Sequence, residues 1–205
     1  MTHSSTLAQA IALHQQGDLQ QAYVLYSSIL SQDANHLQAL CLSGSIAQQS
    51  GNFSKAADFY SRAHQLNPYQ ETICLQLGIC YSNLGELETA NALYRQAYSL
   101  APSQLEPIVN LANNLTKLSQ FQEAYALYQK ALQIYPLSAV VHYNIGSLFL
   151  KSMKPYEARV WLSKALEIQG NYASAWNSLG VALTEIGELN EALNAYQYAS
   201  ECEPS

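Results

Sequence analysis

The sequence is poor in charged residues, and basic residues are the scarcer kind. Charged residues make up 12% of the 205 positions, and nine Lys and Arg face fifteen Asp and Glu, for a formal net charge of -6. Nucleic acids and anionic membranes attract an excess of basic charge, so this balance argues against general binding to either. We therefore expect no nucleic-acid partner and no membrane partner.

The sequence also lacks a run of about 18 apolar residues, and its N-terminus has no basic segment leading into an apolar one. Nothing in it signals export or membrane anchoring. The four cysteines contain no C-x-x-C pair; they are Cys41, Cys74, Cys80 and Cys202. Reduced thiols in a cytoplasmic protein are the simplest interpretation of that pattern.

The sequence does contain a repeat, with a period of 34 residues from near residue 3 to the end. Its clearest column is alanine, and the fourth residue after each alanine is tyrosine in five of six copies. The alanines are Ala22, Ala56, Ala90, Ala124, Ala158 and Ala192, followed by Tyr26, Tyr60, Tyr94, Tyr128, Leu162 and Tyr196. Twelve positions before the alanines stands a second column of small residues, namely Ala10, Gly44, Gly78, Ala112, Gly146 and Gly180.

Glycine and proline mark the turns and ends of predicted helices. Gly17, Gly51, Gly85 and Gly187 each precede a Leu or Phe by two residues, which is typical of the turn in an αα-hairpin. Prolines twelve residues after the alanines predict the end of a second helix. The fifth repeat departs from the pattern, because Met153-Lys154-Pro155 replaces the glycine turn. Ser103 and Glu106 match a capping box at the start of the fourth repeat.

These columns resemble the tetratricopeptide repeat pattern W-x2-L-G-x2-Y, A-x3-F and P, for example in Leu77-Gly78-x-x-Tyr81. The resemblance implies an all-α fold, a right-handed superhelical solenoid of six helix-turn-helix repeats. One hairpin cannot bury its own apolar face, so neighbours must stack, and we expect a single domain spanning residues 1–205. The expected repeats are 3–36, 37–70, 71–104, 105–138, 139–172 and 173–205.

The sequence shows no set of catalytic residues. Its five histidines are scattered, and it has no H-E-x-x-H motif, no glycine-rich phosphate loop and no G-x-S-x-G. We therefore expect a protein that is not an enzyme and that needs no cofactor and no metal. In the tetratricopeptide family the first helix of each repeat lines a concave groove. The resemblance thus implies a scaffold that binds a peptide or a segment of a partner protein in that groove.

Asn110 and Asn144 lie one repeat apart, directly before the Leu or Ile of the motif. They resemble the asparagine ladder in the repeat arm of O-linked N-acetylglucosamine transferases. A primary amide both donates and accepts, so it can pair with a peptide backbone of any sequence. Lys117 and Lys151 close the same two helices, where they are placed to attract an acidic segment. The candidate partner-binding residues are Asn110, Asn113, Lys117, Tyr143, Asn144 and Lys151.

Each of these residues also has a structural interpretation. Asparagine is common at this slot in the family, a pair of lysines can simply be solvated, and Tyr143 can be a spacer beside the groove. Thr116 is a further groove position in the fourth repeat.

The stretch from Ala12 to Leu30 resembles the start of bacterial proteins in which such repeats precede a glycosyltransferase or sulfotransferase domain. The alternative function is therefore a substrate-recruiting arm of a larger enzyme. At the other end, the apolar residues Leu183, Leu193 and Tyr196 are followed by no polar capping helix. We expect either that the chain continues beyond Ser205 or that this end packs on another molecule, as in a homo-oligomer.

Overall fold

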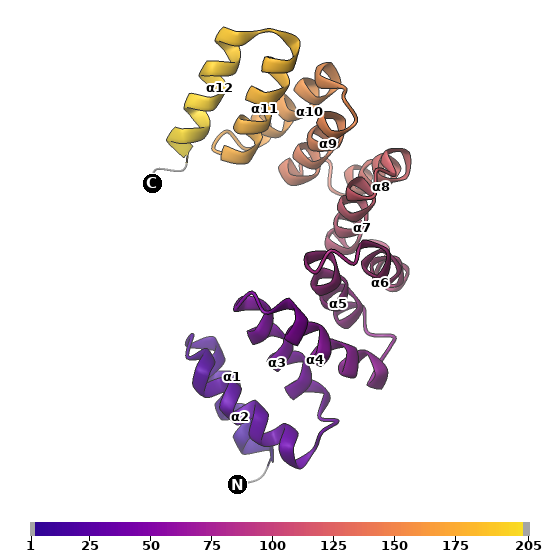
Figure 1. The fold of residues 1–205 in the computed structure, drawn as a ribbon, viewed down its shortest axis with the longest axis vertical. Helices are drawn as coiled ribbons and strands as arrows, with labels where there is room; N and C mark the ends of the chain where they lie inside the picture. Colours follow the sequence, from indigo (N-terminus) through magenta and orange to yellow (C-terminus); the bar gives the residue numbers. More distant parts are fainter. Residues whose placement is uncertain (1–2, 203–205) are drawn as a thin grey trace. The chain divides into compact units, whose positions relative to one another are not determined.

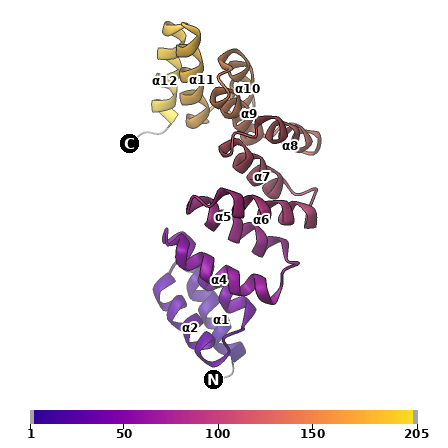
Figure 2. The same ribbon diagram turned by 45° about the vertical axis from the view of Figure 1, so that its right-hand side comes forward.

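The computed structural model describes residues 3–202, and within them the chain is built from helices with no strand. Each predicted repeat is one pair of helices lying side by side (Figure 1, Figure 2). The pairs are α1 (His3–Gln15) with α2 (Leu19–Gln32), α3 (Leu37–Gln49) with α4 (Phe53–Leu66), α5 (Glu71–Asn83) with α6 (Leu87–Leu100), α7 (Leu105–Lys117) with α8 (Phe121–Ile134), α9 (Ala139–Lys151) with α10 (Pro155–Ile168), and α11 (Ala173–Ile186) with α12 (Leu189–Cys202). The predicted all-α fold of six helix-turn-helix repeats is confirmed.

The chain forms two compact units, Met1–Pro102 and Ser103–Ser205. The first unit contains α1 to α6 and the second contains α7 to α12. Within each unit the second helix of one hairpin packs on the first helix of the next, as α2 does on α3 and α10 on α11. The single domain expected from the unbroken repeat stays a prediction.

Each hairpin turn contains one residue in the left-handed backbone conformation. Glycine takes this position in four repeats, with φ from 72° to 91°. Ser119 and Met153 take it in the other two, each at φ 60°. The fourth and fifth repeats therefore keep the turn without a glycine, at a backbone cost of about 1–2 kcal/mol for each residue with a β-carbon. The amide of Lys154 still donates to the carbonyl oxygen of Phe149 at 2.9 Å.

Side-chain capping is present at some helix starts and absent at others. Asp18 caps α2 and Asn52 caps α4, each by accepting from the backbone amide three residues further on. The predicted capping box beginning at Ser103 is wrong. Helix α7 begins at Leu105, its N-cap residue is Gln104, and no side chain makes a capping bond there. The repeat register decides where α7 starts, and it leaves Ser103 one residue too early.

The small-residue column marks where the two helices of a hairpin approach most closely. A β-carbon added to Gly44 or Gly78 would lie 2.9 or 2.8 Å from the ring of Tyr60 or Tyr94. The tyrosine thus fills the space that the small residue leaves, which explains why the two columns occur together. Tyr196 faces Gly180 in the same way but is 37% exposed, in agreement with its predicted place on the uncovered apolar face at this end. The tyrosines that are buried are Tyr26, Tyr60, Tyr94 and Tyr128.

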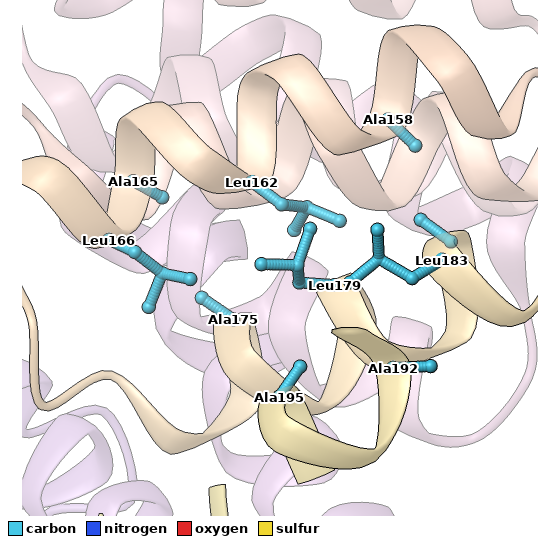
Figure 3. Close-up of a cluster of buried hydrophobic side chains, with 10 residues drawn as sticks. Ala158, Leu162, Ala165, Leu166, Ala175, Leu179, Leu183, Ala192 and Ala195 are labelled. Atoms are coloured by element: carbon cyan, nitrogen blue, oxygen red, sulfur yellow. The ribbon is translucent and has the colours of Figure 1, made fainter. Parts of the chain in front are cut away.

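The core of the second unit includes a cluster between α10, α11 and α12 (Figure 3). Leu162 and Leu179 point toward each other, Leu183 lies beside them, and two alanines of α12 close the cluster. Leu183 is only 4% exposed, so it does not belong to the uncovered face predicted at this end. Leu193 does belong to it, at 67% exposed, because α12 is the last described helix and no later helix packs over it.

Candidate functional site

The first helices of the second unit, α7, α9 and α11, contact one another in chain order. They begin at equivalent positions of the 34-residue repeat, so equivalent residues lie on equivalent faces. Asn110, Asn144 and Ser178 form one such set. Each is partly exposed, and each directly precedes a buried residue of the core. The structure therefore places three polar side chains in matching positions on three adjacent helices.

Asn113 lies one turn further along α7 and is already engaged within its own repeat. Its side-chain oxygen accepts a hydrogen bond from the hydroxyl of buried Tyr128 at 2.5 Å. Burial also raises the pKa of the Tyr128 phenol, so that group stays protonated and keeps donating. The amide nitrogen of Asn113 is not used by that bond. Asn113 can therefore offer a bound segment a donor, and its acceptor serves to hold Tyr128.

Thr116 does not belong to the exposed face, and the prediction that it lines the groove is wrong. Its side chain is 6% exposed, and its hydroxyl donates to the carbonyl oxygen of Ala112 at 2.8 Å. A threonine hydroxyl in a helix readily makes this bond to the residue four positions earlier. Near its C-terminal end, α7 therefore exposes one groove residue fewer than the repeat pattern predicts.

Tyr143 lies at a pocket between α9, α11 and α12. Its ring packs against the ring of Tyr172, with centroids 5.0 Å apart and planes at 46°. Burial raises the pKa of the Tyr172 phenol, and the neighbouring Tyr143 adds to the shift. The pocket has a volume of about 360 Å³. Its lining residues are Tyr143, Ala173, Ser174, Asn177, Ser178 and Ala199.

The sequence predicted Tyr143 as a partner-binding residue, but it did not predict that Ser174 and Ala199 line a pocket with it. Ser174 occupies the position that is Val140 in the preceding repeat. The smaller side chain at that position is the one signal in the sequence that points to extra space here.

Lys117 and Lys151 are the last residues of α7 and α9, and both side chains are exposed. They share an end of their helices, as predicted. The equivalent residue of the sixth repeat is Glu185, so the charge at this position changes sign between α9 and α11. Positive charge on this face is therefore confined to the fourth and fifth repeats.

The chemistry available on this face is hydrogen bonding and aromatic contact. Amide, hydroxyl and phenol groups can donate and accept, and two ammonium groups can attract carboxylates. Among residues 3–202, no three His, Cys, Asp or Glu side chains come together in a way that could hold a metal ion. Within the same residues, no helix is both long and apolar enough to cross a membrane.

Several solved structures have the same fold. A tetratricopeptide repeat protein from Parabacteroides merdae ATCC 43184 is 16% identical, with a TM-score of 0.80 over 98% of this chain and 78% of its own. PilF of Pseudomonas aeruginosa is 16% identical, with a TM-score of 0.76 over 99% of this chain and 92% of its own. YrrB, described as a TPR protein with an unusual peptide-binding site, is 20% identical, with a TM-score of 0.74 over 83% of this chain and 88% of its own.

Comparison with curated protein sequences found no match. The predicted link to the repeat arms of glycosyltransferases or sulfotransferases is not supported by the family matches or by the structures named above. Profiles of the tetratricopeptide repeat match residues 7–71, 71–104 and 105–136, which together make up more than half of the chain. With the period, the paired helices and the tyrosine packing described above, these matches show that the chain belongs to the tetratricopeptide repeat family.

Proposed function

We propose that the protein is a non-catalytic scaffold for protein-protein interaction, which binds an extended peptide segment along α7, α9 and α11. The observation that carries the proposal is the matched placement of Asn110, Asn144 and Ser178, beside the pocket at Tyr143. Partly exposed amide and hydroxyl groups in one register suit a peptide backbone, whose donors and acceptors also repeat. The description of YrrB as a peptide-binding TPR protein supports the same class of ligand.

In this proposal each group has its own task. Asn110 and Asn144 pair with the backbone of the segment, whereas Asn113 contributes its amide nitrogen alone, since Tyr128 holds its oxygen. Lys117 and Lys151 attract acidic side chains at one edge of the face. Tyr143 and the pocket beside it receive an uncharged side chain, because no charged residue lines that pocket.

The test is a titration of a partner recovered by affinity capture, carried out with the double variant Asn110→Ala, Asn144→Ala. Leaving a buried polar group unpaired costs about 1–3 kcal/mol, so losing two amide contacts should weaken binding at least tenfold. A matched control is Asn35→Ala with Asn83→Ala, two exposed asparagines of the first unit. That pair should leave affinity and helical content unchanged. Equal affinity of both double variants would move the binding site off this face.

The lysines are tested separately, because exposed charges act through screened attraction. Changing Lys117 and Lys151 to Ala should reduce the dependence of the binding constant on salt concentration. The asparagine variant should keep that dependence and lose affinity at every salt concentration. An unaltered salt dependence in the lysine variant would remove the two lysines from the site.

The exposed side of α12 is a second contact surface in this proposal. Leu189, Leu193 and Tyr198 are 64%, 67% and 51% exposed, and Tyr196 adds to them. The positions equivalent to Leu189, Leu193 and Tyr196 are buried or partly buried in the earlier repeats. We therefore propose that another protein molecule covers this face, a second copy of the chain being the simplest. Sedimentation at rising concentration should reveal association that Leu193→Gln weakens. A species that stays monomeric at all concentrations would contradict it.

We also propose a cytoplasmic location. The four cysteines are free thiols, which persist in a reducing compartment. A disulfide formed by the protein isolated under non-reducing conditions would argue against that location.

A further inference from the structure

A second pocket lies in the first unit, between α2, α3 and the start of α4, with a volume of about 300 Å³. Leu19 and Tyr23 of α2 form one wall. Ile46 and Ala47 of α3, which are 6% and 5% exposed, form the apolar floor. Polar residues surround the opening, and Lys55 is the one charged residue among those that line the pocket.

The pocket exists because position 47 is alanine. In later repeats the equivalent residue of the first helix is large, namely Tyr81, Leu115, Phe149 and Leu183. In the fifth repeat Phe149 packs on Tyr125, which is the equivalent of Tyr23, with ring centroids 5.4 Å apart and planes at 61°. The chain thus contains, three repeats later, an aromatic side chain in the very place that Ala47 leaves open beside Tyr23.

Tyr23 is held as a fixed wall by two contacts. Phe59 lies edge-on to it, with ring centroids 6.4 Å apart and planes at 72°. The ammonium group of Lys55 lies over its ring, 4.5 Å from the centroid. An aromatic ring positioned on both sides loses little freedom when another ring packs on it, which favours binding.

Lys55 supplies a positive charge at the edge of this pocket. Within residues 3–202 it forms no ion pair with an acidic side chain. Arg62, the next basic residue along the chain, instead donates to the carbonyl oxygen of Ala34. The charge of Lys55 is therefore available to a ligand, and a carboxylate is the group that it favours.

We propose that this pocket binds an aromatic side chain of a partner protein, preceded or followed by an acidic residue whose carboxylate contacts Lys55. The aromatic ring would pack on Tyr23 as Phe149 packs on Tyr125. The site shares no residue with the face of α7, α9 and α11, so an experiment can refute one proposal without refuting the other.

The probe is a capped peptide of sequence Gly-Asp-Phe-Asp-Gly, titrated into the isotope-labelled full chain and followed by the amide signals in nuclear magnetic resonance spectra. The signals of Tyr23, Ala47 and Lys55 should shift. Replacing the phenylalanine of the peptide by alanine should abolish the shifts. Replacing both aspartates by asparagines should weaken binding about threefold, as expected for an exposed ion pair.

Variants of the protein separate the apolar from the charged contribution. Ala47→Leu introduces a residue that later repeats carry at this position, and it should reduce affinity at least tenfold by filling the pocket. Lys55→Gln should reduce affinity about threefold. Lys164→Gln is the matched control, because Lys164 lies over the ring of Trp161 at 4.7 Å in the same way and does not line this pocket. That control should bind the peptide like the unmodified protein.

If Ala47→Leu does not fold, Tyr23→Ala replaces it, since the next repeat carries Ala57 at the equivalent position. That change removes the wall and should also abolish binding. The proposal is overturned if the peptide shifts none of the three amides at roughly millimolar concentration, or if it binds the pocket variants undiminished. It is also overturned if these amides shift with protein concentration alone, which would assign the pocket to a second copy of the chain.

Discussion

Gly146 of α9 and Gly180 of α11 occupy the same position in neighbouring repeats. Replacing each by alanine tests whether the small-residue column is where the two helices of a hairpin approach most closely. At Gly146 the added β-carbon would lie 2.5 Å from Cγ of Leu162 and 3.3 Å from its backbone nitrogen. At Gly180 the nearest atoms belong to the ring of Tyr196, at 2.6 Å. The same chemical change thus meets the same kind of close contact twice.

The two contacts differ in how they can be relieved. Leu162 is fully buried and its Cγ is close to the main chain, so α9 and α10 must move apart to accommodate the new methyl group. Tyr196 is 37% exposed, so its ring can turn toward solvent. Overpacking typically costs about 1–3 kcal/mol, while alanine gains about 1 kcal/mol over glycine inside a helix.

At Gly146 the upper end of the overpacking cost applies, because the contact is short and involves the main chain. Gly146→Ala should therefore lower the free energy of unfolding of the second unit by about 2 kcal/mol. At Gly180 the ring can move, so Gly180→Ala should leave that free energy unchanged or raise it by up to about 1 kcal/mol.

The assay is urea unfolding followed by tryptophan fluorescence. Trp161 and Trp176 are the two tryptophans of the chain, and both lie in the second unit, so the signal reports that unit. Circular dichroism of the folded variants checks that helical content is kept. The packing account is refuted if Gly146→Ala is as stable as the unmodified protein, or if Gly180→Ala is the more damaging of the two.

Three further substitutions test other parts of the structure. Ala124→Leu, at a fully buried position of α8, should cost about 1–3 kcal/mol and make the tryptophan transition occur earlier; an unshifted transition would contradict the repeat register. Met153→Gly should stabilise the second unit by about 1 kcal/mol, because glycine adopts φ of 60° without strain, and a lower urea midpoint would contradict this. Burial raises the pKa of Tyr94 from 10.0 to about 12, so its contribution to stability is present below about pH 10 and is lost as pH rises toward about pH 12. Both tyrosines lie in the first unit, so urea unfolding is followed here by circular dichroism. Tyr94→Phe should flatten this alkaline loss of the unfolding midpoint, whereas Tyr69→Phe, at a residue that is 80% exposed, should leave it unchanged.

The sequence alone was sufficient to predict most of the fold, because a 34-residue period contains both the helices and the turns between them. The prediction held even at Met153, where the glycine is missing, since the packing of the neighbouring helices imposes the turn. Local rules were less reliable. The capping box at Ser103 satisfied a sequence pattern, but the register of the repeat placed the helix start at Leu105.

For the candidate site, the sequence predicts which residues share a face but not which contacts their side chains make. A period identifies which residues share a face, so the sequence is enough to match Asn110 with Asn144. The period does not show which of those side chains are buried or already form hydrogen bonds within the protein. The bond from Tyr128 to Asn113 and the burial of Thr116 depend on side chains of two helices meeting, and they emerge only from the structure.

The number and pairing of the helices follow from the sequence alone, because each repeat carries its own small residues and turn, and a tyrosine or leucine in the packing position. The pockets and exposed apolar side chains between the repeats depend on the tertiary structure. The pocket beside Tyr23 depends on Ala47, Phe59 and Lys55 meeting from α3 and α4, and the exposure of Tyr196 depends on the absence of a later described helix over α12. The physical reason is that periodicity specifies the direction of each side chain, whereas free space between helices depends on the sizes of all the side chains that meet there.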